Sequence, residues 1–374
     1  MTNKKKGLLL LLLFTVMLSN AQNPQGGAAA TNIRNAKYPL ILPDHRVAFN
    51  IKAPDAKRVQ IDLGKKYDLV KDASGNWTAT TDSIGEGFHY YSLLIDGIAV
   101  ADPASESFYG MGRMASGIEI PFKGGDYYAL KDVPHGEIVV KHYYSTVTHS
   151  WRNFYMYTPP GYNQNSNQKY PVLYILHGGG EDERGWAMQG KTDLILDNLI
   201  AEKKAKPMLV VMPDANMPAA GFGEEGLKAF AQEMETVIIP FVDKNYRTET
   251  TAKSRALAGL SMGGINTLYT GLYHTNLFSY LGVFSSGWIL PAQNELAEAQ
   301  YQFLAKDEQK VRNDLKLLFV SDGDKEDIAY KNCRAMLSQF DRLKIKYNYY
   351  EYPGGHTWPV WRNDLLHFAP LLFQ

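Results

Sequence analysis

A serine set between two glycines, in the string Gly259-Leu260-Ser261-Met262-Gly263, has the spacing of a catalytic nucleophile. The string follows an apolar run over 255–260 and precedes a helical pattern over 262–273, so Ser261 is predicted at a strand-to-helix turn. Glycines two residues away on either side let the strand and the helix approach closely around such a turn. An ordinary glycine-rich turn can carry the same string, and its position between a strand and a helix is what favours a nucleophile.

A second glycine-rich string, His177-Gly178-Gly179-Gly180, ends an earlier apolar run. Hydrolases with this kind of nucleophile turn place a backbone N–H here to bind the oxyanion formed during acyl transfer. No Lys-Ser or Lys-Thr pair follows the glycines, which argues against a phosphate-binding loop. We therefore predict oxyanion donors from Gly178 and Gly179, and from Met262 directly after the serine. His177 is expected to be structural.

A serine hydroxyl needs a base to take its proton, and that base is held in turn by a carboxylate. Nine histidines are present, and His356 is favoured because Pro353-Gly354-Gly355-His356 forms a glycine loop after the last strand candidate. Histidines in or before the first strand of the large domain, or beside helices, are expected to be ordinary packed or solvated side chains: His135, His142, His149, His274 and His367.

The carboxylate is expected from a loop between Ser261 and His356, because the chain order in this architecture is serine, acid, histidine. The segment 321–327 follows the strand candidate 315–320 and offers four acids. We favour Asp327, with Asp324 as the alternative. The remaining acids are expected to cap the next helix or to face solvent.

These residues fall in a stretch where apolar strands alternate with amphipathic helices. Strands are predicted in 138–157 and over 170–176, 208–212, 255–260, 280–284, 315–320 and 347–352, and helices over 192–203, 226–244, 262–273 and 327–343. Alternation of this kind indicates a mostly parallel sheet covered by helices on both faces. Ligands of such sheets bind at the carboxyl ends of the strands, where the candidate residues lie.

Upstream of this stretch, short alternating runs separated by turn signals predict a small β-sandwich over 38–124. Lys4 to Lys6 precede about twelve apolar residues, so 1–21 is predicted to be a cleaved signal peptide, followed by a flexible leader over 22–37. The large domain then occupies 125–374. The mature protein is expected to be secreted or periplasmic, with no membrane association after cleavage.

The amino-acid composition argues against some classes of partner and cofactor. Lys plus Arg and Asp plus Glu both total 39, and this balance argues against nucleic acid as the main partner. The single cysteine, Cys333, excludes an internal disulfide framework and a multi-thiolate zinc site. We expect neither a metal nor an organic cofactor.

The segment from about 144 to 362 resembles the feruloyl and acetyl-xylan esterases of carbohydrate esterase family one, a branch of the α/β-hydrolases similar also to enterochelin esterases. The resemblance rests on YPVLYILHGGGEDERGW, RALAGLSMGGINTL, FSYLGVFSSGW and GGHTWPVWR, among other pieces. It implies Ser261 as nucleophile, His356 as base, backbone donors from Met262 and the Gly178/Gly179 loop, and an acid within 323–327. The family spacing is glycine, two residues, aspartate, whereas three residues separate Gly323 from Asp327.

The predicted sandwich resembles the family-48 carbohydrate-binding module through AFNIKAPDAKRVQIDLG and GNWTATTDSIGEGFHYYSLLIDGIAVADP, and we expect it to be immunoglobulin-like. Some of its aromatic residues could contact glycan or belong to the core: Trp77, Tyr90 and Tyr91. In the large domain, four tryptophans fall in loops near the expected site and could contact a phenolic acyl group or a sugar, or pack structurally: Trp358, Trp361, Trp288 and Trp186.

The resemblance implies a serine carboxylic ester hydrolase that releases ferulate from a plant polysaccharide such as arabinoxylan. Acetyl-xylan esterase and siderophore esterase activity remain alternatives, because all three share the catalytic motifs. A hypothesis of a different class is a non-catalytic glycan-binding protein that uses the hydrolase fold as a scaffold. The oligomeric state is not indicated by the sequence.

Overall fold

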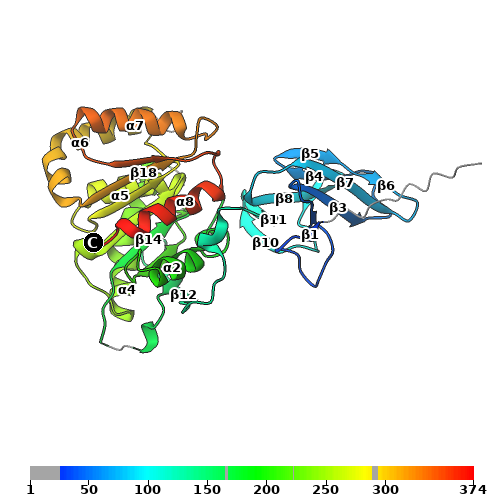
Figure 1. The fold of residues 1–374 in the computed structure, drawn as a ribbon. Helices are drawn as coiled ribbons and strands as arrows, with labels where there is room; N and C mark the ends of the chain where they lie inside the picture. Colours follow the sequence, from blue (N-terminus) through cyan, green and yellow to red (C-terminus); the bar gives the residue numbers. More distant parts are fainter. Residues whose placement is uncertain (1–25, 165–166, 222, 289–293) are drawn as a thin grey trace, which may run out of the picture.

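The computed structural model describes residues 26–374 except 165–166, 222 and 289–293, and it consists of a β-sandwich beside a larger α/β part (Figure 1). The predicted signal peptide, 1–21, lies outside the described residues. Within the described part of the chain, no helix is long and apolar enough to cross a membrane.

The sandwich has two antiparallel sheets, with strand orders β1-β2-β3-β7-β6 and β10-β11-β8-β4-β5, and β9 pairs with β8. Alternate residues of β3 and β8, such as Phe49 and Tyr91, pack in one core between the sheets. The immunoglobulin-like topology stays a prediction. The strands are β1 (Gly27–Ala28), β2 (Leu40–Ile41), β3 (Arg46–Lys52), β4 (Val59–Leu63), β5 (Lys65–Asp68), β6 (Val70–Lys71), β7 (Asn76–Ser83), β8 (Gly87–Ile95), β9 (Ile98–Val100), β10 (Ser107–Gly110) and β11 (Arg113–Ile120).

The described end of the predicted leader is ordered, contrary to the expectation of a flexible segment. Gly27 and Ala28 form β1 and pair with β2, and Ala29 is buried in the sandwich core. Asn32 closes the following turn by donating its side-chain amide to the carbonyls of Ala36 and Pro39. The segment is small, polar and without a hydrophobic period, so no strand was predicted in it. Backbone pairing and the side-chain amide of Asn32 hold it in place.

The α/β part has one eight-stranded sheet with the order β12-β13-β15-β14-β16-β17-β18-β19. The two strands at one edge, β12 and β13, run antiparallel, and the pairs from β14/β15 to β18/β19 are parallel. The sheet is therefore mixed but mainly parallel. Its strands are β12 (Glu137–Ser145), β13 (Ser150–Thr158), β14 (Val172–Leu176), β15 (Leu209–Pro213), β16 (Arg255–Leu260), β17 (Tyr280–Phe284), β18 (Leu317–Asp322) and β19 (Asn348–Glu351).

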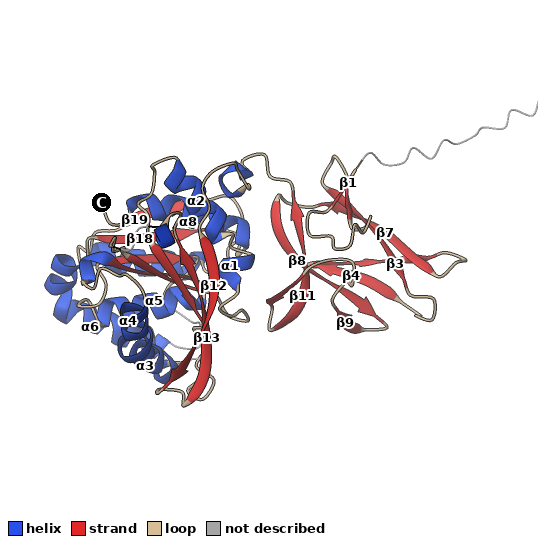
Figure 2. Cartoon of the chain, turned by 90° about the horizontal axis from the view of Figure 1, so that it is seen from below, coloured by secondary structure: helices blue, strands red, loops and turns tan. Residues whose placement is uncertain are grey.

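Helices cover both faces of this sheet, and each face has its own hydrophobic core (Figure 2). Along β14, for example, Tyr174 belongs to one core and Leu173 and Ile175 to the other, as expected for strands buried on both sides. The helices are α1 (Gly185–Met188), α2 (Thr192–Ala201), α3 (Glu224–Glu233), α4 (Ile239–Asn245), α5 (Met262–Tyr273), α6 (Asn294–Asp314), α7 (Tyr330–Arg342) and α8 (Trp358–Phe368).

The helix predicted over 226–244 is interrupted. A π-helical turn, Met234–Ile238, separates α3 from α4, and Pro240 lies in the first turn of α4. Proline lacks a backbone N–H, which is consistent with a shift in the hydrogen-bond ladder just before it. Three helices were not predicted: the short α1, α6 and α8. For α8 the tryptophan-rich segment conceals the helical period, because side chains all round the helix are buried.

Candidate active site

Ser261 lies at the carboxyl end of β16, where the chain turns sharply into α5. Its backbone is strained, with φ of 51° and ψ of −116°. Close packing at this turn requires both flanking glycines: a Cβ on Gly259 would lie 2.4 Å from the Gly263 carbonyl carbon, and one on Gly263 would lie 2.6 Å from the His177 oxygen. The strand and helix ends match the prediction residue for residue, and the turn presents Ser261 to the pocket described below.

The glycine loop after β14 lies next to Ser261. The Gly178 N–H donates to the Glu181 carboxylate at 3.3 Å, so this donor is already engaged within the loop. Among the described residues, neither the Gly179 N–H nor the Met262 N–H donates to another group of the protein, and the Met262 N–H belongs to the first turn of a helix, where donors lack intrahelical partners. Of the predicted oxyanion donors, Gly179 and Met262 are therefore the two available ones.

His177 is buried and holds two strand ends together. Its Nδ1 contacts the Gly178 carbonyl at 2.8 Å, while its Nε2 accepts the Ala215 N–H at 3.0 Å and lies 3.2 Å from Asp214. This position behind the glycine loop agrees with the structural role predicted for it.

His356 and Asp327 are joined by a hydrogen bond between His356 Nδ1 and Asp327 Oδ1, 2.8 Å long. The Asp327 carboxylate is buried and also accepts the N–H groups of Gly323 and Ala329. Burial alone would raise the pKa of Asp327, but the hydrogen bonds from His356 and Ala329 hold it below its usual value. Asp327 is therefore an ionised carboxylate able to orient the imidazole.

Asp324, the alternative acid, has a different position. Its carboxylate accepts the Gly354 N–H at 2.9 Å, while its own N–H donates to the Gly354 carbonyl at 2.8 Å. These reciprocal bonds fasten the acidic loop to the loop that carries His356. A Cβ on Gly323 would lie 2.1 Å from the Gly354 oxygen, so the loops touch without intervening side chains. The structure thus pairs Asp327 with the histidine and Asp324 with the loop backbone.

Ser261 and His356 line one pocket of about 450 Å³, a size typical of small-molecule sites. In the described structure Ser261 Oγ makes no hydrogen bond to the imidazole; in substrate-free enzymes such bonds are often long and tighten on binding. Gly178 and Gly179 also line the pocket. No described group of His, Cys, Asp or Glu side chains is arranged to hold a metal ion.

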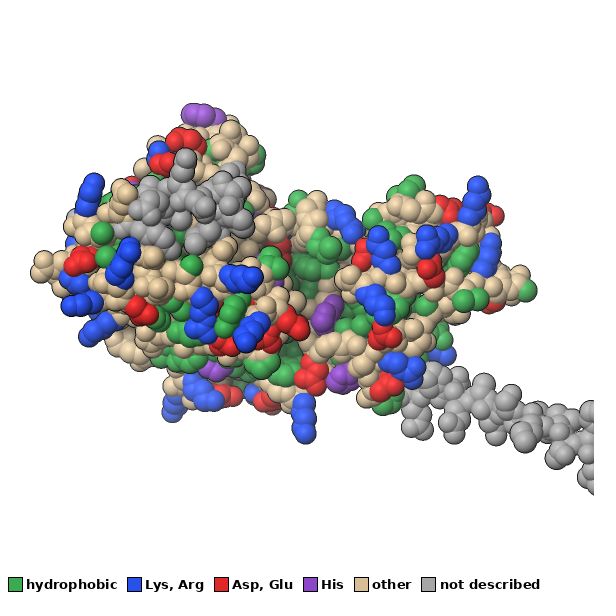
Figure 3. Space-filling view, turned by 90° about the horizontal axis from the view of Figure 1, so that it is seen from above, with side chains coloured by type: hydrophobic (Ala, Val, Ile, Leu, Met, Phe, Trp, Pro, Cys, Tyr) green, Lys and Arg blue, Asp and Glu red, His purple; other side chains and the backbone are tan. Residues whose placement is uncertain are grey.

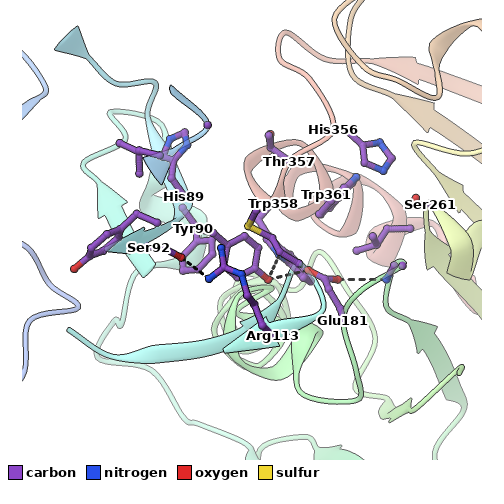
Figure 4. A pocket seen from close by; sticks show the side chains of 18 of the residues that line it. His89, Tyr90, Ser92, Arg113, Glu181, Ser261, His356, Thr357, Trp358 and Trp361 are labelled. Atoms are coloured by element: carbon purple, nitrogen blue, oxygen red, sulfur yellow. Dashed lines mark hydrogen bonds between the residues drawn. The ribbon is translucent and has the colours of Figure 1, made fainter. Parts of the chain in front are cut away.

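The opposite wall of this pocket comes from the sandwich, which the sequence did not indicate. Figure 4 shows His89, Tyr90, Ser92 and Arg113 on the sandwich side, facing Ser261 and His356. Arg113 Nη1 donates to Ser92 Oγ at 2.6 Å. Seen from above, the surface is hollowed between the two parts (Figure 3). Of the sandwich aromatics considered above, Tyr90 and Tyr91 both line the pocket, and Tyr91 also packs in the sandwich core. Trp77 belongs to that core and donates its indole N–H to the Ala53 carbonyl.

The four tryptophans predicted near the site are all buried, and only Trp358 and Trp361 line the pocket. Trp361 packs edge-on against the His356 ring at 5.1 Å between centroids, and Trp358 packs against Trp361 in the same way at 5.2 Å. Trp186 continues this chain behind Trp358 at 5.3 Å. Trp288 packs against Phe340 in the core on the other face of the sheet. Trp186 and Trp288 are therefore not among the described residues that line the pocket, and their positions favour the alternative of structural packing.

Two further carboxyls, Asp322 and Asp364, are buried close to Asp327. Burial, reinforced by the charge of Asp327 and opposed by Cys333, raises the pKa of Asp322 to about 8. Burial likewise raises the pKa of Asp364, although the Ser321 hydroxyl opposes it. Asp322 therefore carries a proton near neutral pH in the folded protein.

We expect Asp322→Asn to weaken the dependence of stability on pH. Between its ordinary pKa of 3.8 and the folded value of about 8, the folded state holds a proton on Asp322 that the unfolded state has lost. Stability therefore falls as pH rises through this window, by at most about 1.4 kcal/mol per pH unit for one group. Urea midpoints at pH 5 and pH 8 should differ less in the variant than in the parent protein.

The control for this experiment is Asp324→Asn. Hydrogen bonds from the Gly354 and Glu326 N–H groups lower the pKa of Asp324, so its contribution is lost only as pH falls through the acid range. It should leave the difference between pH 5 and pH 8 unchanged. Equal pH dependence in the parent and Asp322→Asn proteins would contradict the assignment.

A serine at a strained turn between a central parallel strand and a helix is the arrangement that α/β-hydrolase-type esterases share. Residues 145–371 match the family model described as an esterase, and the chain belongs to that family of carboxylic ester hydrolases. The prediction of an esterase is thereby confirmed.

Among curated relatives, the chain is 40% identical over 303 residues to an endo-1,4-beta-xylanase/feruloyl esterase of Xylanibacter ruminicola, covering 78% of this chain and 40% of that protein. It is 30% identical over 202 residues to endo-1,4-beta-xylanase Y of Acetivibrio thermocellus, covering 51% of this chain and 17% of that protein. The chain therefore spans less than half the length of these relatives.

Among solved structures, a ferulic acid esterase from Anaeromyces mucronatus is similar with a TM-score of 0.58 and 26% identity, covering 66% of this chain and 95% of that one. The enterobactin esterase of Shigella flexneri shares the fold with a TM-score of 0.65 and 18% identity, covering 87% of this chain and 92% of that one. That coverage exceeds the α/β part, so the likeness extends into the sandwich.

Proposed function

We propose that this esterase releases ferulate, or a related hydroxycinnamate, from plant cell-wall polysaccharide such as arabinoxylan. The observation that carries the proposal is the pocket in which Ser261 lies beside the hydrogen-bonded pair of His356 and Asp327. The 40% identity to a xylanase/feruloyl esterase supports the choice of acyl group. Apolar and aromatic pocket residues, including Trp361 and Phe88, suit a phenolic ring.

In the proposed reaction, His356 takes the proton of Ser261 as Oγ attacks the ester carbonyl. The tetrahedral oxyanion accepts hydrogen bonds from the N–H groups of Gly179 and Met262. The sugar alcohol leaves with the proton from His356, which gives an acyl-serine. Water activated by the same imidazole then releases ferulate and restores Ser261. Asp327 holds the imidazole through Nδ1 and stabilises its charged form throughout.

The proposal also covers the organisation of the whole chain. Residues 1–21 would direct export to the cell surface or periplasm and be removed, and 125–374 would carry the chemistry. The sandwich over 38–124 would be a module related to family-48 carbohydrate-binding modules. Its place at the pocket, where Arg113 and His89 line the wall facing Ser261, supports contact with the polysaccharide portion of the substrate.

A substrate panel tests the acyl group. The purified protein is given methyl ferulate, feruloylated arabinoxylan, acetylated xylan and enterobactin, with Ser261→Ala protein as the blank. We expect ferulate release from the first two, detected by chromatography. Hydrolysis of acetyl groups or enterobactin without ferulate release would overturn the proposed substrate. Inertness toward p-nitrophenyl acetate, with retention on a xylan column, would instead indicate a glycan-binding protein.

Enterobactin is included because one observation favours a siderophore ester. The Shigella flexneri enterobactin esterase shares the fold over both the sandwich and the α/β part, whereas the ferulic acid esterase covers a share close to that of the α/β part alone. At 18% identity this likeness concerns the fold and not the substrate, so we rank it second.

A further inference from the structure

Glu181 is a buried carboxylate that connects three parts of the molecule. It follows the glycine loop, and its Oε2 accepts the Gly178 N–H at 3.3 Å. Its Oε1 accepts the indole N–H of Trp358, at the start of the helix after His356, at 2.9 Å. Oε1 also accepts the Tyr90 hydroxyl, which comes from the sandwich, at 2.9 Å (Figure 4). Three donors thus surround one carboxylate beside the candidate oxyanion site.

Tyr90 is held firmly in place for this contact. Its hydroxyl oxygen accepts the side-chain amide of Gln189 at 2.6 Å and the Trp358 indole N–H at 3.2 Å, while donating to Glu181. Its ring packs closely against Gly110, where a Cβ would lie 2.3 Å from the ring carbon Cζ. The hydroxyl therefore has a fixed position at the boundary between the two parts.

The sandwich also forms a backbone hydrogen bond with the glycine loop. The Gly112 N–H, in the turn between β10 and β11, donates to the Gly180 carbonyl at 2.8 Å. Gly180 has φ of 76°, and a Cβ there would lie 3.0 Å from the Gly112 nitrogen. The sandwich is therefore hydrogen-bonded to two consecutive residues at the end of the glycine loop: to the Gly180 carbonyl and to the Glu181 side chain.

These ties matter because the Gly179 N–H belongs to the peptide that joins Gly178 to Gly179, and a Cβ on Gly179 would meet no heavy atom within 4 Å. The carbonyl of that peptide, on Gly178, lies 2.8 Å from His177 Nδ1 and accepts the Glu181 N–H at 3.3 Å. The orientation of the Gly179 N–H therefore depends on hydrogen bonds to His177 and to Glu181, whose carboxylate also accepts the Gly178 N–H and the Tyr90 hydroxyl.

We propose that the sandwich is a positioning element of the esterase site, and that Tyr90, acting through Glu181, orients the oxyanion donor of Gly179. The inference rests on the oxyanion role assigned to Gly179 in the proposed function. It assigns Tyr90 and Glu181 as positioning residues, since neither needs to touch the reacting atoms.

The first test is Tyr90→Phe in the full chain, which removes the hydroxyl and keeps the ring. The probe is p-nitrophenyl acetate, because its acyl group is small and its hydrolysis does not depend on ferulate specificity. We expect kcat to fall about 10-fold with KM within 2-fold of the parent value, because the misplaced donor acts in the transition state and not in substrate binding.

The matched control is Tyr143→Phe. The Tyr143 hydroxyl also donates to a buried glutamate, Glu233, at 3.0 Å, but it lies on the edge strand β12 and does not line the pocket. It should lower the melting temperature about as much as Tyr90→Phe while leaving kcat unchanged. An equal kcat in the two variants would overturn the proposal, and so would a rise in KM for feruloylated arabinoxylan alone, because Tyr90 would then be a substrate contact.

Glu181→Gln provides a second test. Glutamine keeps an oxygen for Tyr90 and Trp358 but places an amide NH₂ where Oε2 accepts from Gly178. We expect a fall in kcat at least as large as for Tyr90→Phe, and a double variant no worse than Glu181→Gln, because the two side chains act in series. If the kcat losses of the two single substitutions multiplied in the double variant, Tyr90 and Glu181 would act independently, which would contradict the proposal. If the protein hydrolysed p-nitrophenyl acetate but released no ferulate, the result would contradict the proposed acyl group and not the positioning role of the sandwich.

Discussion

Replacement of Ser261 by alanine should lower kcat on p-nitrophenyl acetate and on methyl ferulate by at least ~10³-fold, with the fold unchanged. Ser261 Oγ is the atom that forms the acyl-enzyme. The oxyanion donors remain in the variant, but no nucleophile attacks the ester carbonyl beside them. Since the alanine side chain is smaller and keeps the Cβ, the strained turn at φ of 51° remains as compatible with it as with serine.

The measurement pairs initial rates with a circular dichroism melt, so that loss of activity is separated from loss of structure. A suitable matched control is Ser286→Ala, which removes a hydroxyl that donates to the Ser261 carbonyl at 2.7 Å without providing a nucleophile. It should retain most of the activity. Activity of Ser261→Ala near that of the parent protein would remove the basis for a serine mechanism.

The second large effect is expected for Asp327→Asn, with kcat reduced by about 10³- to 10⁴-fold. The amide has no charge to stabilise the imidazolium, and its NH₂ group can face His356 Nδ1 and favour the wrong tautomer. When the NH₂ group takes the place of Oδ1, the amide oxygen in the place of Oδ2 still accepts the Gly323 N–H, whereas the Ala329 N–H loses its acceptor. We therefore expect the variant to be less stable but to remain folded.

Asp324→Asn distinguishes the two acids of this loop. It weakens the reciprocal bonds with Gly354 but leaves the pair of Asp327 and His356 in place, so the loss of kcat should stay below about 10-fold. If Asp324→Asn proved the more damaging of the two substitutions, the assignment of the acid would be reversed.

The sequence predicted well those features that depend on local backbone chemistry. The strand 255–260, the turn at Ser261 and the helix 262–273 were predicted with correct ends, because glycine spacing and apolar period both require them. The family spacing left the acid open, and the structure separates Asp327 from Asp324 by what each carboxylate contacts.

Features that depend on distant contacts were missed. Trp186 and Trp288 are loop residues in the sequence pattern, and only the packing of the two cores shows that they are buried. The sandwich wall of the pocket is also invisible to local patterns, because Tyr90 and Glu181 meet across 91 positions of the chain. An acidic residue directly after three glycines is the one signal that could have drawn attention to Glu181.

The edge-to-face contact between Trp361 and the His356 ring gives the enzyme an internal optical reporter. Trp361 also lines the pocket, so a phenolic acyl group that enters beside the imidazole changes the surroundings of the indole. Indole emission should respond to that change, so occupancy of the pocket in the Ser261→Ala protein can be followed by fluorescence without a label and without turnover.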